Sequence, residues 1–264
     1  MLVTVTLGIL IGAILGLTGA GGAILSVPAL VFSLNWSMQQ AAPVALVAVA
    51  IGAGIGAAEG LRRGLVRYKA AFLMAAVGAL LTPLGIRVAN TLPQDRLMVI
   101  FAAVMLLSAA RQLHHKNAHG DEMVAPYKPG WVNPETGRFH WTWPTALLLS
   151  SIGALTGFLA GLLGVGGAFV MVPLLQRFTN VSMHGVVATA LMVTALISTS
   201  GVFSAVLHGA TLPMPVTAAF AGAIAAGMIV GRLLSRRATG RHVQLGFATL
   251  LIVVAGSLLA KALG

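Results

Sequence analysis

Long stretches of this chain carry no charged side chain. The uncharged runs cover 1–58, 70–86, 97–110, 139–176, 178–231 and 242–260. A helix needs about 20 predominantly apolar residues to cross a bilayer, so these runs hold roughly eight to ten membrane segments. Strands of a membrane barrel would alternate polar and apolar residues, and these runs do not alternate. The pattern predicts an all-α integral membrane protein with about eight full transmembrane helices.

Two of the apolar stretches are interrupted by a glycine-rich phrase that occurs twice. The phrase reads GLTGAGGAILSVP from Gly16 and GLLGVGGAFVMVP from Gly161. After each phrase follow three unbroken apolar segments, which we expect to be crossing helices. They lie at 39–60, 70–90 and 96–113, and again at 184–207, 214–234 and 243–261. We expect the broken stretches to form half-helices or hairpins.

The repeated phrases belong to an internal duplication. At an offset of 145 residues, NWSM at Asn35 matches NVSM at Asn180, and Pro28 matches Pro173. Later matches, such as Gly85 with Gly231, follow an offset of 146 residues. The two copies are separated by a polar segment rich in proline and glycine. We therefore divide the chain into a first membrane repeat (1–113), a linker (114–143) and a second repeat (144–264).

The charged residues between the segments indicate how the two repeats are oriented. A hairpin at each glycine phrase gives inverted repeats, whereas a single crossing gives parallel ones. The inverted arrangement puts thirteen of the sixteen basic residues on one face, and the parallel arrangement splits them nine to seven. Because basic residues gather on the cytoplasmic side, the count favours inversion, with the linker cytoplasmic and both termini outside. Inverted repeats are common in transporters.

The glycines of the two phrases predict non-helical backbone within the membrane. They are Gly19, Gly21 and Gly22 in the first phrase and Gly164, Gly166 and Gly167 in the second. Unwound backbone is tolerated at that depth only where it is buried in protein or lines a cavity. Helices that restart near Ala23 and Ala168 would direct their N–H groups toward such a cavity, which suits a small anion. Close packing of helices is the alternative role for either glycine cluster.

Hydroxyl side chains near the breaks complete the predicted substrate site. Thr18 and Ser26 flank the first break, and Thr194 and Ser198 share one helical face in the second repeat. Hydroxyls can donate to an anionic oxygen without adding a fixed charge. Each of them can instead bond to the backbone of its own helix.

Composition and charge exclude several other classes. Hydrophobic residues make up 58% of the chain and charged ones 8%, which is outside the range of soluble proteins. The net charge of +11 is spread between apolar runs, so we predict no nucleic-acid partner. The chain has no cysteine, and its five acidic residues lie outside the middle of the apolar runs. We therefore predict no metal site, no cofactor, no catalytic residues and no enzyme activity.

In these paired phrases the chain resembles the sulfite exporter TauE/SafE family. The resemblance covers nearly the whole chain except the linker. It implies a multi-pass permease of the inner membrane that exports sulfite, sulfoacetate or a related organosulfonate anion. An anion channel is the main alternative, and a membrane-embedded enzyme is a weaker one. The expected partners are the small anion and the lipid bilayer. The small residues at 48–58 are typical of a close helix contact, either within the chain or between the subunits of a homo-oligomer.

Overall fold

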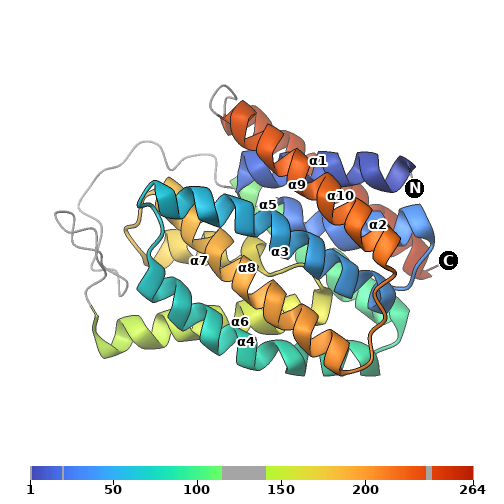
Figure 1. Cartoon of the computed structure of the whole chain (residues 1–264), viewed down its shortest axis with the longest axis horizontal. Helices are drawn as coiled ribbons and strands as arrows, with labels where there is room; N and C mark the ends of the chain where they lie inside the picture. The colour runs from blue at the N-terminus through green and yellow to red at the C-terminus, as the bar shows by residue number, and fades with distance from the viewer. Residues whose placement is uncertain (1, 20, 115–140, 236–239, 264) are drawn as a thin grey trace.

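The computed structural model describes residues 2–19, 21–114, 141–235 and 240–263 (Figure 1). Most of the predicted linker lies outside these residues. The described chain is helical throughout, apart from turns, short connections and an isolated bridge residue. Its elements are α1 (Leu2–Thr18), a 3-10 turn η1 (Gly22–Leu25), α2 (Ser26–Leu34), α3 (Met38–Arg62), α4 (Tyr68–Thr91), α5 (Gln94–His114), α6 (Trp143–Leu163), α7 (Ala168–Phe178), α8 (Met183–Leu207), α9 (Met214–Ser235) and α10 (Gly240–Leu263).

Seven of the described helices are long and apolar enough to cross a membrane: α3, α4, α5, α6, α8, α9 and α10. Helix α1 is also apolar but has 17 residues, and it precedes the first break as α6 precedes the second. The six expected crossing segments agree with the observed helices to within three residues at each end. The all-α membrane fold is therefore confirmed, with α1 as a slightly shorter eighth long helix.

Local capping fixes where the helix after each hairpin begins. The hydroxyl of Ser37 accepts a hydrogen bond from the N–H of Gln40, and the Gln40 side chain accepts one from the N–H of Ser37. Ser182 caps α8 at the equivalent position by accepting from the N–H of Gly185. These bonds satisfy N–H groups that have no partner inside the helix.

Each hairpin packs its first helix against a helix of the other repeat. Gly12 of α1 lies so close to α9 that an added Cβ would stand 2.2 Å from the carbonyl oxygen of Ile224. A Cβ on Gly157 of α6 would stand 2.1 Å from the carbonyl oxygen of Gly78 in α4. Small residues allow this close approach of membrane helices. The two contacts are equivalent at the repeat offset, so α1 pairs with α9 as α6 pairs with α4.

Helices α3 and α8 pack together and run antiparallel. Gly60, near the end of α3, lies against Ala188, near the start of α8. Leu46, in the first part of α3, lies against Gly201, near the end of α8. These two helices occupy equivalent places in the two repeats, and their opposite directions are the geometry that inverted repeats require. Common ancestry and orientation in the membrane stay predictions.

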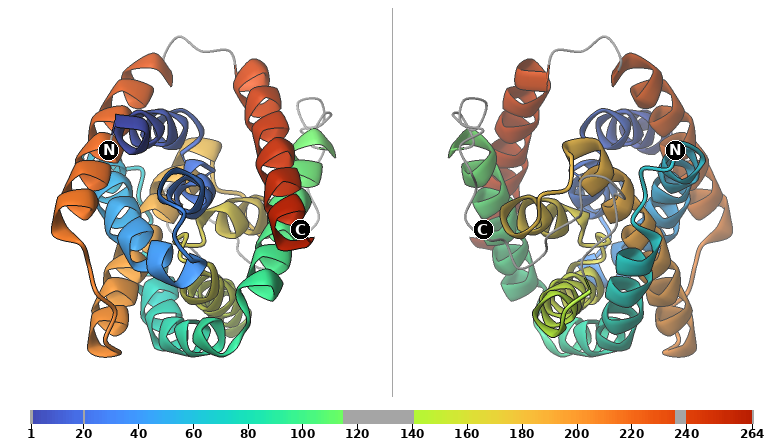
Figure 2. Two further views of the ribbon diagram at one scale, coloured as in Figure 1. Left: turned by 90° about the vertical axis from the view of Figure 1, so that its right-hand side faces the viewer. Right: turned by 90° about the vertical axis from the view of Figure 1, so that its left-hand side faces the viewer.

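The ends of the chain and the short helices have distinct places in the bundle. Both termini lie at the right-hand end of Figure 1, whereas α5 ends and α6 begins toward the left. Seen along the bundle, the short helices α2 and α7 are surrounded by longer ones (Figure 2). The turn η1 contacts α7, so the two restarting segments meet inside the protein.

Candidate functional site

The first glycine break connects α1 to η1. Gly19 has a φ of +75°, a backbone conformation that residues other than glycine rarely adopt. Thr18 closes the end of α1, because its hydroxyl donates to the carbonyl of Ile14 at 2.8 Å and accepts from the N–H of Gly21 at 3.1 Å. The hydroxyl of Thr18 therefore holds the break in shape. The helix restarts as the turn Gly22–Leu25, as the predicted start near Ala23 required.

The second glycine break connects α6 to α7. Gly164, Gly166 and Gly167 have φ values of +72°, +72° and +70°. Gly164 ends α6, and its N–H donates to the carbonyl of Ala160 at 2.9 Å. Gly167 is the N-cap of α7, which begins at Ala168 as predicted. A residue other than glycine at any of these three positions would therefore adopt this backbone only at a substantial conformational cost.

Gly22 and Gly167 also make the close packing that the sequence left open as an alternative. A Cβ on Gly22 would stand 2.4 Å from the backbone nitrogen of Leu15 in α1. A Cβ on Gly167 would stand 2.6 Å from the carbonyl oxygen of Thr156 in α6. Glycine at these two positions lets each hairpin fold back on its own first helix. Their predicted contact with a substrate stays a prediction.

Three predicted hydroxyls are buried near these breaks without a hydrogen-bond partner in the described part of the chain. They belong to Ser26, Thr194 and Ser198, whose exposed fraction is 0%. The side chains of Thr194 and Ser198 face Gly166, since a Cβ there would stand 2.7 Å from Thr194 Cγ2 and 2.8 Å from Ser198 Oγ. A buried hydroxyl without a partner costs about 1–3 kcal/mol. The second break therefore faces one unbonded donor, the Ser198 hydroxyl, and the Thr194 hydroxyl is a second unbonded donor one helical turn away.

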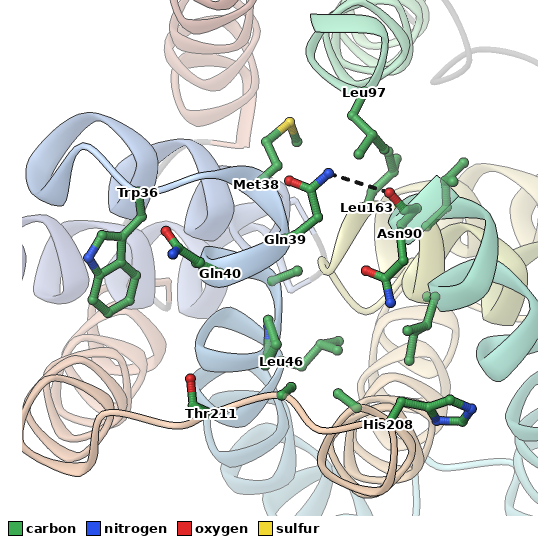
Figure 3. Close-up of a pocket in the computed structure, with 18 of the residues that line it drawn as sticks. Trp36, Met38, Gln39, Gln40, Leu46, Asn90, Leu97, Leu163, His208 and Thr211 are labelled. Carbon is green, nitrogen blue, oxygen red and sulfur yellow. Dashed lines mark hydrogen bonds between the residues drawn. The ribbon is translucent and has the colours of Figure 1, made fainter. Parts of the chain in front are cut away.

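A cavity of about 470 Å³ opens where α3 begins and where α4, α6 and α8 end. Its polar lining consists of the amides of Gln39, Gln40 and Asn90, together with Trp36, His208 and Thr211 (Figure 3). Gln39 joins α3 to the end of α4 through long hydrogen bonds to the carbonyls of Ala89 (3.5 Å) and Leu92 (3.4 Å). Amide N–H groups can contact an anion and release it again because they carry no net charge.

The cavity ends beside the second glycine break but does not include the predicted site. Gly161, Leu162 and Leu163 line it, and Gly164 follows directly. None of the ten predicted site residues is part of its lining. The sequence analysis missed the cavity, because its polar residues come from separate helix ends and connections and have no shared motif. The sequence feature that could have indicated the cavity is the polar start of the helix after the first hairpin, which reads MQQ from Met38.

Two geometric features thus coincide in one half of the bundle: a cavity open at the end that carries the termini, and a glycine break behind it with unbonded hydroxyls. A family model described as Sulfite exporter TauE/SafE matches residues 4–258, which is nearly the whole chain. The chain belongs to this family. The predicted family resemblance is therefore confirmed.

Other comparisons agree with membership of the TauE/SafE family. A probable membrane transporter protein of Xylella fastidiosa strain Temecula1 is 26% identical over 193 residues, which are 73% of this chain and 69% of the relative. Its counterpart in Xylella fastidiosa strain 9a5c is 25% identical over the same shares of the two chains. No solved structure matches the chain. As a member of the TauE/SafE family whose described residues include seven helices able to span a membrane, this chain is a multi-pass membrane transporter.

Proposed function

We propose that this transporter carries a small sulfur oxyanion, sulfite or an organosulfonate such as sulfoacetate, out of the cell across the inner membrane. The observation that carries the proposal is the buried Ser198 hydroxyl that faces Gly166, together with the unbonded hydroxyl of Thr194 one helical turn away in α8. The next residue, Gly167, is the N-cap of α7, which begins at Ala168. A helix start directs unbonded N–H groups and the positive end of the helix dipole outward from the helix.

The chemistry of this arrangement suits an anion that must be released again. Hydroxyl and backbone N–H groups donate hydrogen bonds to sulfonate or sulfite oxygens, and a helix N-terminus adds a partial positive charge. A buried lysine or arginine would bind the anion more strongly and slow its release. A hydrogen bond to a charged group contributes about 1.5–3 kcal/mol, so three or four such donors supply enough binding energy for a transported substrate.

Export of an anion needs no proton-binding carboxylate within the membrane. A membrane potential that is negative inside drives each negative charge outward by about 2.3 kcal/mol per 100 mV. The five acidic residues of the chain lie outside the middle of the apolar runs, which supports this source of energy. The proposal therefore includes electrogenic export with the linker on the cytoplasmic side.

Counterflow of radiolabelled sulfite, sulfoacetate and taurine into proteoliposomes tests the proposal. Vesicles preloaded with the same unlabelled compound should accumulate label faster than protein-free vesicles, and a potential that is positive on the receiving side should speed net uptake. Taurine carries an ammonium as well as a sulfonate, so it separates recognition of the sulfonate from recognition of net charge. Indifference to all three compounds would contradict the substrate class, and single-channel currents would replace a carrier with an anion channel.

A further inference from the structure

The cavity opens at one end of the bundle, and the equivalent region at the other end holds a basic side chain. At the repeat offsets of 145 and 146 residues, the cavity-lining residues Gly161 and Ile86 correspond to Gly16 and Arg232. Gly16 and Arg232 lie in contact, since a Cβ on Gly16 would stand 2.8 Å from the backbone nitrogen of Arg232. The positions that line the open cavity at one end therefore correspond to positions beside an arginine at the other end.

Arg232 reaches from α9 to α3 and joins the two helices there. Its Nη2 donates to the carbonyl of Gly56 at 3.0 Å, and its Nη1 lies 3.2 Å from Glu59 Oε2. The side chain of Arg232 is 19% exposed and that of Glu59 is 32% exposed. An ion pair with this degree of burial and an extra hydrogen bond holds its helices together more firmly than a surface pair, and loss of one partner leaves the other uncompensated.

A second arginine makes this cluster positive overall. Arg63 lies one turn after Glu59 in α3, and its Nη2 is 2.5 Å from Glu59 Oε1. Two guanidinium groups therefore share one carboxylate, which leaves a net charge of +1. If α3 and α9 separate, Arg63 can keep Glu59 neutralised while Arg232 is released to meet an incoming anion. The cluster suits the mouth of a path for anions.

The equivalent positions at the cavity end cannot form such a contact. Glu59, Arg63 and Arg232 correspond to Ser204, His208 and Ile86. None of these three side chains is a carboxylate, and Ile86 and His208 line the open cavity. The difference in residue type between the two ends therefore coincides with the difference between an open and a bridged end.

We propose that Glu59 and Arg232 form the gate that closes the transport path at the end opposite the cavity. The proposal rests on the transport function proposed above. In the structure the gate is closed while the cavity end is open. Opening requires the Arg232 guanidinium to leave both Glu59 and the Gly56 carbonyl, and an anion can replace those two acceptors.

Cysteine labelling tests this gate, because the native chain contains no cysteine and an introduced one is the only thiol. Ala188→Cys places a thiol beside the gate, at the buried residue that packs against Gly60, the neighbour of Glu59, and corresponds to cavity-lining Pro43. Ala89→Cys places one in the cavity. Both are labelled with N-ethylmaleimide, a neutral thiol reagent, in purified protein in nanodiscs, where each face is accessible, and the rates are measured by mass spectrometry.

Glu59→Gln should raise the labelling rate of Ala188→Cys by about tenfold or more and lower that of Ala89→Cys, because it shifts the population toward the state open at the gate. Arg63→Gln is the matched control, since it removes an ion pair within α3 that bridges no second helix. The exchange Glu59→Arg with Arg232→Glu should restore the slow rate. Arg232→Lys, which keeps the charge but cannot reach both acceptors, should give an intermediate rate.

Unchanged labelling of Ala188→Cys in both Glu59→Gln and Arg232→Lys would overturn the gate. Equal acceleration by Arg63→Gln would also overturn it, since the effect would then follow charge rather than the bridge between α3 and α9. Labelling needs no transported substrate, so failure of sulfite counterflow and failure of the gate are separate results.

Discussion

The carbonyl oxygen of Gly78 stands 2.1 Å from where a Cβ on Gly157 would be. The backbones of α4 and α6 are therefore in direct contact, and residue 157 has no room for a side chain. This contact positions the end of α6, at which the cavity and the second glycine break meet.

Gly157→Ala should destabilise the protein, because the added methyl group forces α4 and α6 apart. We expect a loss of about 1–3 kcal/mol, the usual cost of overpacking. The midpoint of thermal unfolding in detergent measures it. Gly222→Ala is the control within α9, since a Cβ there meets no heavy atom within 4 Å. Glycine in a helix costs about 0.5–1 kcal/mol relative to alanine, so this variant should equal or exceed the wild type. Equal midpoints for both variants would contradict the close contact.

Ser198→Ala should weaken transport without lowering stability. Its hydroxyl has no hydrogen-bond partner in the described chain, so its removal costs the fold nothing, whereas a lost bond to a charged ligand costs about 1.5–3 kcal/mol. We expect the apparent KM for the transported anion to rise about tenfold or more. Ser200→Ala is the matched control, because its hydroxyl donates to the carbonyl of Ile197. A wild-type KM in Ser198→Ala would remove this hydroxyl from the proposed site.

Thr18→Val should have the opposite pattern. The hydroxyl of Thr18 bonds to Ile14 and Gly21, so its loss leaves the first break without its cap. We expect a loss of stability of about 1 kcal/mol and an unchanged apparent KM. Thermal unfolding and transport by the same purified protein check both parts. A raised KM with an unchanged unfolding midpoint would instead place Thr18 among the residues that contact the anion.

Reporter fusions after the linker and at the C-terminus should lie on opposite sides of the membrane. The partition of thirteen basic residues against three predicts a cytoplasmic linker and an external C-terminus. Alkaline phosphatase and green fluorescent protein fusions distinguish the two sides. Activity of the same reporter at both positions would refute the inverted arrangement.

Hydrophobic pattern alone was sufficient to place the long helices. The observed ends of α8 and α9, Met183–Leu207 and Met214–Ser235, differ from the expected segments by one residue at most. This accuracy has a physical reason, because charges and turn residues mark the membrane boundary. The restart at Ala168 could be placed for a similar reason, since glycines at 164, 166 and 167 each disfavour the helix by about 1 kcal/mol relative to alanine.

The role of individual glycines could not be predicted from the sequence. Gly166 faces the Ser198 hydroxyl and the Thr194 methyl group of α8, whereas Gly22 faces the backbone of α1. Both belong to the same phrase, and only the position of the neighbouring helices separates them. The small residues at 48–58 show the same limit: Gly52 and Gly56 contact α9 within the chain, and Gly54 meets nothing within 4 Å.

The cavity and the arginine cluster needed the tertiary structure. The cavity combines residues that are far apart in the sequence, from α3, α4, α5, α6, α8 and the connections before α3 and α9. Glu59 and Arg232 are 173 positions apart in the chain, and each looks like an ordinary charge at the end of a membrane segment. Their pairing follows from the packing of α3 against α9, which apolar periodicity does not specify.

The exchange of helices between the two repeats has a consequence for biosynthesis. The glycine face of α1 packs on α9, which is synthesised near the end of translation. Helix α4 packs on α6, which is synthesised only after the linker. The first repeat therefore enters the membrane with two unmatched surfaces that only the second repeat can cover. If translation stops within the linker, these two surfaces stay uncovered and the incomplete protein becomes a substrate for quality control. Two halves expressed separately still have complementary surfaces, and we expect them to assemble in the bilayer.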